Sequence, residues 1–259
     1  MDFHPVEFNL RESFRVLAAG RKAGDVLELP GLSIASLGAK FQMFNAAFLS
    51  GPVANAAELE ERLRQAAGHF RSRSMRWSFW VCDDWLAAPA RRVLSQQCDR
   101  AGLRLSADMP GMMTDRLRSV KRTLPKLQFV RVDSARTLAD FHGIGTVCFN
   151  VPLDWFSEVF DAAMPVERPR FSCWAGYLDG LPVATAACVR TGGTLGLYNV
   201  ATAPGYRKRG FGEAITRHVA SANADAETLV LQSTSHGLGL YERLGFRTVT
   251  RILVYNSMP

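Results

Sequence analysis

The stretch VATAPGYRKRGFGEAITRHV, residues 200–219, joins an apolar run to an amphipathic run through a loop with one proline, three glycines and three basic residues. Glycine lets the backbone approach another group closely, and Arg207, Lys208 and Arg209 repel one another unless an anion lies between them. A helix that begins just after them presents unpaired N–H groups and the positive end of its dipole. The stretch therefore predicts an anion-binding turn between a strand and a helix.

The spacing of the glycines indicates which anion this turn could hold. Gly210 and Gly212 let the amides of residues 208–213 converge on one point, which suits a phosphate or pyrophosphate. A Walker loop needs G-x-x-x-x-G-K-[ST], and the dinucleotide fingerprint needs a third glycine where this chain has Ile215. The structural alternative is a flexible turn with surface arginines.

Length and composition limit the number of domains and the class of protein. The 259 residues are enough for one large domain or two smaller ones, and 47% hydrophobic with 21% charged residues is typical of a globular protein. We find no apolar run long enough to span a membrane and no signal peptide, and we expect a cytoplasmic protein. No membrane partner is expected.

Cysteines and charge exclude some classes of site. The five cysteines are scattered, without a C-x-x-C pair, so we predict neither disulfides nor a metal site and interpret all five as small buried side chains. They are Cys82, Cys98, Cys148, Cys173 and Cys188. The net charge of +7 is spread along the chain and favours polyanionic ligands without selecting one.

The second half of the chain alternates helices and strands. Helical spacing covers residues 135–149 and 153–164, three short strand-like runs follow within residues 170–202, and a helix is expected at residues 211–222. A buried strand at 227–233, a short helix at 236–245 and a final strand at 246–255 complete the order α-α-β-β-β-α-β-α-β.

The first half repeats this plan in its later part. We expect β structure within 32–51, a helix opened by Asn55, a strand at 75–84, a helix at 88–102 and an extended segment at 103–113. FNAAF in the first half matches YNVAT in the second, and CDRAGLRLSADM matches YERLGFRTVTRI, which indicates an internal duplication. The first copy has SGPVANAAE where the second has the basic glycine loop. We therefore predict two domains, residues 1–124 and 125–259, and an anion site only in the second.

Two motifs in the second half resemble a known family. R-K-R-G-F-G at residues 207–212 matches the [RQ]-x-x-G-x-[GA] acyl-CoA signature of the GNAT superfamily of N-acetyltransferases, and L-Y-E-R-L-G-F at residues 240–246 resembles its helix before the last strand. The resemblance covers residues 126–259 and makes the first half a degenerate copy. It implies an α/β protein with two GNAT-like domains, each with a mixed, mostly antiparallel sheet flanked by helices.

The resemblance also implies a set of acetyl-CoA-binding residues. The family's strand before the loop carries a bulge and splays from the next strand, and the pantetheine arm binds main-chain groups left free in the gap. The pyrophosphate lies on the loop amides, with Arg207 and Lys208 supplying charge and Arg209 facing the 3′-phosphate or solvent. The implied cofactor-binding residues are Val200, Ala201, Thr202, Arg207, Lys208, Arg209, Gly210, Phe211, Gly212 and Glu213.

Catalytic groups are implied less completely. Tyr241 lies where the family places the general acid for the CoA sulfur, and a core tyrosine is the alternative. The strand before the loop has no acidic residue, so Asn199 becomes the candidate to orient a water or the substrate, with a purely structural bond as the alternative. Other groups considered as a base are Asp154, Glu158, Asp161, His142 and His236, for which solvated or incidental positions are the alternatives.

One aromatic cluster needs a separate interpretation. Trp77, Trp80 and Trp85 lie among arginines and could stack single-stranded bases. The alternation of Trp77, Phe79 and Val81 instead indicates one buried strand face, so we expect no nucleic-acid partner.

The expected function is therefore acyl transfer from acetyl-CoA to a small-molecule or peptide amine by direct attack. A non-catalytic acyl-CoA sensor is the main alternative, and transfer from aminoacyl-tRNA is a third, against which the intact phosphate loop argues. A homodimer is left open, and the acceptor, the acyl length and the general base are not specified by the sequence.

Overall fold

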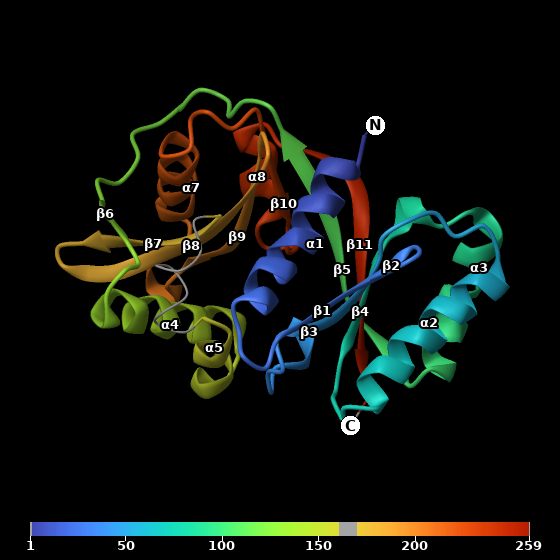
Figure 1. Ribbon diagram of the computed structural model, residues 1–259. Helices are drawn as coiled ribbons and strands as arrows, with labels where there is room; N and C mark the ends of the chain where they lie inside the picture. Colours follow the sequence, from blue (N-terminus) through green and yellow to red (C-terminus); the bar gives the residue numbers. More distant parts are fainter. Residues whose placement is uncertain (1, 161–169, 259) are drawn as a thin grey trace.

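The computed structural model describes residues 2–160 and 170–258, and these residues form one sheet of eleven strands (Figure 1). The order across the sheet is β1-β2-β3-β4-β11-β5-β10-β9-β8-β7-β6. The strands are β1 (Asp25–Leu29), β2 (Leu32–Ser36), β3 (Asn45–Leu49), β4 (Ser78–Cys82), β5 (Leu103–Thr114), β6 (Gln128–Arg131), β7 (Phe171–Leu178), β8 (Leu181–Thr191), β9 (Thr194–Thr202), β10 (Thr228–Gln232) and β11 (Arg247–Ser257).

Helices cover both faces of the sheet (Figure 1). They are α1 (His4–Ala19), α2 (Ala56–Arg71), α3 (Ala88–Arg100), α4 (Ala135–Phe149), α5 (Leu153–Val159), α7 (Phe211–Ser221) and α8 (Leu238–Leu244), with three short 3₁₀ turns, η1 (Gln42–Phe44), η2 (Asp83–Trp85) and η3 (Pro204–Tyr206). One apolar core joins α1, α4 and α5 to one face. On the opposite face, α2 and α3 pack over the strands near β4, and α7 and α8 pack over β8 and β9. In the described residues, no helix has the length and apolar character needed to cross a membrane.

The internal duplication is visible in the strand pairing. In each half one pair of strands is parallel and is joined by a helix: β3 and β4 through α2, and β9 and β10 through α7. All other pairs between strands of the described residues are antiparallel. A crossover helix is the usual way to connect parallel neighbours, and both copies use one.

The two halves exchange their last strands. β11, from the second half, lies between β4 and β5, and β5, from the first half, lies between β11 and β10. The sheet is therefore continuous across the expected division at residue 124. The division at residue 124 therefore stays a prediction about where the two sequence repeats meet. It does not separate two sheets, because the strands on either side of it are interleaved.

Three elements were not predicted, and one of them is β1, because the expected β structure began at residue 32. Helix α1 was missed although Val6, Leu10 and Phe14 recur every four residues and are all buried. The short strand β6 was also missed, and it adds one strand to the expected order of the second half. The helix expected at 153–164 ends at Val159 as α5, and Asp161 lies outside the described residues.

The aromatic cluster of the first half belongs to the interior. Trp77 stacks on Phe70 of α2 with ring centroids 5.0 Å apart, and Phe79 and Val81 join the same core. The prediction of one buried face was too narrow, because Trp80, on the other side of β4, packs in the core under α1. Both faces of β4 are therefore covered, and Trp85, just after the strand, is partly buried between the two cores.

Four of the five cysteines are buried as expected, and one is not. Cys148, near the end of α4, is partly exposed, and its thiol lies 3.3 Å from the carbonyl oxygen of Thr202. The prediction of burial was wrong here because the last turn of α4 crosses the end of β9 instead of packing inside the core.

Candidate functional site

The candidate site begins where two parallel strands part. β9 and β10 pair from Thr194 and Thr228 as far as Gly196 and Val230. Beyond that point β9 pairs only with β8, up to Thr202, while β10 pairs only with β5. The expected splay is confirmed, and it leaves one edge of β9 without a strand partner over residues 197–202.

A bulge lies inside this unpaired part of β9. Tyr198 faces Ala187 and Ala201 faces Thr185, so two residues of β9 stand opposite one residue of β8. The first of them, Asn199, has φ +47°, a left-handed conformation that asparagine tolerates better than most residues. The expected bulge is thus confirmed, and it turns the main chain locally out of the regular pleat.

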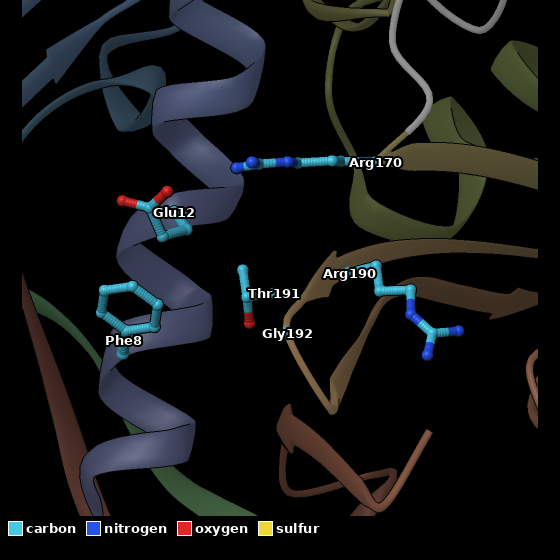
Figure 2. Close-up of a pocket in the computed structure, with 6 residues that line it drawn as sticks. All are labelled: Phe8, Glu12, Arg170, Arg190, Thr191 and Gly192. Atoms are coloured by element: carbon cyan, nitrogen blue, oxygen red, sulfur yellow. The ribbon is translucent and has the colours of Figure 1, made fainter. Parts of the chain in front are cut away.

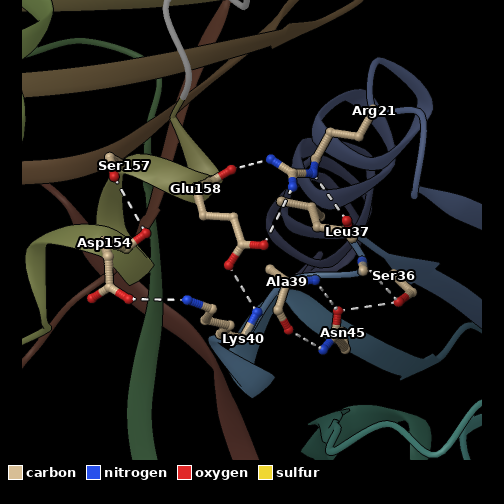
Figure 3. Close-up of polar contacts among 10 residues, drawn as sticks. Arg21, Ser36, Leu37, Ala39, Lys40, Asn45, Asp154, Ser157 and Glu158 are labelled. Carbon is tan, nitrogen blue, oxygen red and sulfur yellow. Dashed lines mark hydrogen bonds and ion pairs between the residues drawn. The ribbon is translucent and has the colours of Figure 1, made fainter.

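Asn199 differs from its counterpart in the first copy. Asn45 is buried, its amide oxygen accepts from the Ala39 N–H at 3.1 Å, and its amide nitrogen donates to the Ala39 carbonyl at 2.8 Å (Figure 3). The side chain of Asn199 is partly exposed and makes no hydrogen bond to any described residue. The first copy uses its asparagine to hold a loop, whereas the second leaves the amide available to a ligand.

The turn after β9 exposes main-chain donors. Lys208 has φ +61° and Gly210 has φ +93°, and α7 begins directly after Gly210 without a side-chain cap. Among the described residues no acceptor bonds the amides of residues 208–213, and the first N–H of this helix with a partner is that of Ala214, 2.9 Å from the Gly210 oxygen. Successive donors in such a turn form an anion-binding concavity at the positive end of the helix. This geometry fits the pyrophosphate of CoA.

The matching turn of the first copy is closed by its own side chains. The Asn55 side chain accepts from the Glu58 N–H at 3.0 Å, and the Glu58 carboxylate accepts from the Ala54 N–H at 2.8 Å. The Arg62 guanidinium then bonds the carbonyl oxygens of Gly51 and Pro52 at 2.8 and 2.6 Å. Two amides at the start of α2, those of Ala54 and Glu58, therefore have side-chain acceptors, whereas the amides of residues 208–213 have none among the described residues.

The cations of the loop do not all point in the expected way. Arg207 Nε donates to the Thr202 carbonyl at 3.2 Å, so this side chain folds back onto β9. The guanidinium of Arg209 lies 5.4 Å from the ring centroids of Tyr206 and Phe211. The Thr202 carbonyl, expected to be free, thus already accepts from Arg207 as well as from the Cys148 thiol. Lys208 is exposed on the turn.

A further cation reaches the turn from the segment between β5 and β6. Arg122 Nη2 lies 3.3 Å from the Glu213 carboxylate and would lie 3.5 Å from a β-carbon at Gly210. Glu213 also pairs with Arg217 at 2.9 Å, so two guanidinium groups surround one carboxylate. The local charge beside the open amides is therefore positive. The sequence offered no spacing signal for Arg122, because its contact spans 91 positions.

Tyr241 lies in the core between α8 and the sheet. Its ring packs edge to face against Phe246 with centroids 5.6 Å apart, and only 7% of the residue is exposed. Burial raises the pKa of its phenol well above the ordinary value of 10. The hydroxyl is therefore protonated at neutral pH, and it makes no hydrogen bond to a described residue.

Three of the candidates for a base, Asp154, Glu158 and His142, have other partners, whereas His236 is exposed. Glu158 accepts from the Lys40 N–H at 2.9 Å and interacts with Arg21, and Asp154 pairs with Lys40 Nζ at 3.2 Å (Figure 3). These contacts join α5 to the loop after β2. His142 is buried and bonds the Phe160 carbonyl. None of these groups is directed at the bulge by the contacts it makes.

A separate cavity of about 410 Å³ lies between α1 and the turn that joins β8 to β9 (Figure 2). Its lining residues are Phe8, Glu12, Arg170, Arg190, Thr191 and Gly192. Arg190 points away from α1 and pairs with Asp225 at 2.6 Å. The cavity is at the start of β9, whereas the splay opens toward its end, so the two are different sites.

Comparisons with known proteins identify the domain that holds the splay and the turn. Residues 169–248 match the family model of the acetyltransferase (GNAT) domain. The GCN5-related N-acetyltransferase from Kribbella flavida has a TM-score of 0.72 at 16% identity, covering 98% of this chain and 95% of that chain. The GCN5-related N-acetyltransferase from Sphaerobacter thermophilus has a TM-score of 0.57 at 13% identity, covering 88% and 78%.

A duplicated relative shares the fold over nearly the whole chain. The tandem GNAT protein from the clavulanic acid biosynthesis pathway has a TM-score of 0.56 at 12% identity, covering 98% of this chain and 95% of that chain. No curated protein matches the sequence. At these identities the solved structures establish the fold, and both halves of the chain take part in it.

Proposed function

We propose that this chain, a tandem GNAT protein whose residues 169–248 form the acetyltransferase domain, transfers the acetyl group of acetyl-CoA to an amine of a small molecule or peptide. The single observation that carries the proposal is the uncapped start of α7. Six consecutive amides, residues 208–213, have no acceptor among the described residues and lie directly after the open end of β9. A helix start of this kind favours a diphosphate over a neutral ligand.

In this proposal, different residues around the bulge bind different parts of acetyl-CoA. The amides of the turn hold the diphosphate, and the main-chain groups of Val200 and Ala201, at the unpaired edge of β9, bond the pantetheine amides. Arg207 ties the turn to β9 through the Thr202 carbonyl, which keeps the two parts of the site in register. The strand edge therefore positions the thioester, and the helix start holds the nucleotide.

The chemistry needs a hydrogen-bond donor and an aligned amine. Acetyl-CoA supplies the activated acyl group: the amine nitrogen bonds to the thioester carbon, the C–S bond breaks, and the thiolate leaves. Tyr241 stays protonated because burial raises the pKa of its phenol, so it stabilises the departing thiolate by donating a hydrogen bond to the sulfur, and the thiolate takes its proton from solvent. Asn199 presents its free amide to the amine or to a water that takes the amine proton.

Calorimetry and a thiol-release assay test this function in sequence. We expect CoA to bind the full chain with measurable heat, and we expect thiol release when acetyl-CoA is mixed with an amine that the site accepts. Tyr241→Phe should lower turnover about 100-fold with CoA affinity unchanged, since it removes a hydrogen-bond donor to the leaving sulfur and no binding group. No heat at millimolar CoA, or an unaltered rate in the variant, would contradict the respective assignment.

One observation favours a second function, that of an acyl-CoA sensor without turnover. Among the described residues, β9 carries no carboxylate, and Asp154 and Glu158 are held in ion pairs with the first half. A chain without a base could still bind the nucleotide at α7. CoA binding without thiol release across a broad panel of amines, including antibiotics, amino acids, polyamines and peptide N-termini, would favour the sensor.

A further inference from the structure

Helix α1 of the first half is seated on the point where β9 and β10 part. Gly196 is the last residue of β9 that pairs with β10. A β-carbon at Gly196 would lie 1.8 Å from Asn9 Oδ1 of α1, a distance that no structure tolerates. The glycine at the fork is therefore required by the side chain of Asn9.

Asn9 bridges the two strands of the second half on this face. Its amide nitrogen donates to the Val189 carbonyl of β8 at 3.1 Å and to the Thr191 hydroxyl at 2.7 Å. Its amide oxygen accepts from the Tyr198 hydroxyl of β9 at 2.6 Å. Asn9 is completely buried, so water cannot replace any of these partners.

Tyr198 connects this bridge to the bulge. It directly precedes Asn199, whose left-handed conformation is unfavourable and persists only where neighbouring contacts hold it. The hydroxyl of Tyr198 is a neutral donor, because burial raises its pKa above the ordinary value. On the bulged side of the fork, β9 has no β10 partner to fix its register. The bond from Tyr198 to Asn9 is therefore a fixed point next to the bulge.

We propose that Asn9 is a positioning residue for the acyl-CoA site: through Tyr198 it holds the bulge of β9 at the geometry that receives the pantetheine arm. This inference rests on the proposed function. It also gives the first half a role in the reaction, although that half carries no nucleotide turn of its own. The role is mechanical, and Asn9 touches neither the amine nor the thioester.

The test compares three variants of the full chain. Asn9→Ala removes the bridge, Tyr198→Phe removes only the hydroxyl that reaches it, and Leu17→Ala loosens α1 two turns away, where the helix packs in the core. Each variant is titrated with CoA and with adenosine 3′-phosphate 5′-diphosphate, which lacks pantetheine. Hydrogen–deuterium exchange of peptides covering residues 198–202 is measured without ligand.

The expected pattern separates positioning from general loosening. Asn9→Ala and Tyr198→Phe should each weaken CoA binding about tenfold, leave the affinity for the nucleotide fragment within twofold, and speed exchange at residues 198–202 about tenfold. Leu17→Ala should change none of these quantities by more than twofold. If Leu17→Ala matches the other two, or if Tyr198→Phe behaves as the unchanged protein, the positioning role is overturned.

The exchange measurement does not depend on the proposed function. If the unchanged chain binds neither CoA nor the fragment, the proposed function fails, and the exchange at residues 198–202 still decides whether Asn9 holds the bulge. If CoA binds normally and exchange is unaltered in Asn9→Ala and Tyr198→Phe, the function stands and the positioning role fails.

Discussion

Arg122 enters the candidate site from a segment that belongs to neither parallel strand pair. Its guanidinium lies between the Glu213 carboxylate and the position above Gly210, and its side chain is 51% exposed. Because Arg217 already neutralises Glu213, the charge of Arg122 remains available to a phosphate group beside the turn. A contact to a phosphate by a half-exposed cation is screened by water, so its effect on binding is modest.

We therefore expect Arg122→Gln to weaken CoA binding about fivefold, or about 1 kcal/mol, and to reduce its dependence on salt. Lys121→Gln is the matched control, because it removes the same charge from the neighbouring position, which has no contact with the turn. Calorimetry at two salt concentrations measures both variants. Equal losses of CoA affinity in the two variants would contradict a specific role of Arg122, because they would show that only the overall positive charge of the segment matters.

Gly210 and Gly212 should respond differently to the same substitution. Gly210 has φ +93°, so an alanine there should lower the free energy of unfolding by about 1 to 2 kcal/mol. The β-carbon of that alanine would lie 3.1 Å from Pro125. An alanine at position 212 meets atoms no closer than 3.4 Å and replaces a glycine inside a helix. Urea unfolding and CoA titration should show losses for Gly210→Ala only, and a stable, fully binding Gly210→Ala would contradict the role of the turn.

For single residues, the sequence predicts local backbone geometry better than contacts between residues that are far apart in the chain. The turn, the bulge next to it and the absence of an acid on β9 follow from spacing and from the family resemblance. Arg122 and Asn9 do not, since each meets its partner only after the chain has folded across the sheet. The roles of Tyr241, Asn199 and the loop residues stay predictions.

Among the elements, α2 and α7 are equivalent helices with opposite starts. The side chain of Asn55 caps α2, whereas no side chain in the described part of the chain caps α7. A cap satisfies orphan donors and stabilises the helix, whereas open donors serve a ligand and leave the helix dependent on it.

Removing the cap of α2 should therefore affect stability alone. Asn55→Ala should lower the free energy of unfolding by about 1 kcal/mol, and Asn55→Ser should restore most of it. CoA affinity should not change in either variant. Urea denaturation with calorimetry measures both quantities, and a loss of CoA affinity in Asn55→Ala would show that the first copy contributes to the site directly.

Element prediction succeeded for most of the long elements, but it missed α1 in spite of its apolar period and the short strands β1 and β6. The helices at 56–71 and 88–100 and the strands of the second half are close to the predicted ranges. Strand β6 has four residues and, among the described strands, pairs only with β7. Four residues are too few to show the alternation of apolar and polar side chains that predicts a strand.

For the whole molecule, the exchange of last strands decides how the halves depend on each other. β5 has no neighbour from its own half, because both of its partners, β11 and β10, come from the second. Internal similarity predicted two copies of one plan, but strand order within a sheet is not encoded in a local pattern. The continuous sheet could not be predicted for that reason.

Neither half is expected to fold alone. Residues 1–124 and 125–259, produced separately, should be unfolded or aggregated, because each would expose the strand edges that the other covers. Refolded together, they should regain the circular dichroism of the intact chain and its CoA binding. A cooperative thermal transition in either isolated half would contradict this expectation.

Buried phenols should make the whole molecule sensitive to alkaline pH. Burial raises the pKa of Tyr255 and of Tyr177 to about 12, and it also raises those of Tyr198 and Tyr241, from an ordinary value of 10. Below pH 10 the phenols are protonated in both states, and above it the unfolded chain loses protons first, so stability falls as pH rises.

The melting temperature should therefore decline above pH 10 and stay level between pH 8 and 9.5 as far as these groups are concerned. Tyr241→Phe removes one of them, so its melting temperature should decline less steeply over the same range. Scanning calorimetry of both proteins gives the comparison, and parallel curves would mean that Tyr241 ionises as freely when folded as when unfolded.

The position of β11 between β4 and β5 also has a consequence for synthesis on the ribosome. β4 ends at Cys82 and β5 at Thr114, yet the strand that separates them begins only at Arg247. A nascent chain must therefore carry two unsatisfied strand edges until translation has passed the second copy, and pairing over such a separation is slow. The amino-terminal copy is translated first, but it cannot finish folding first.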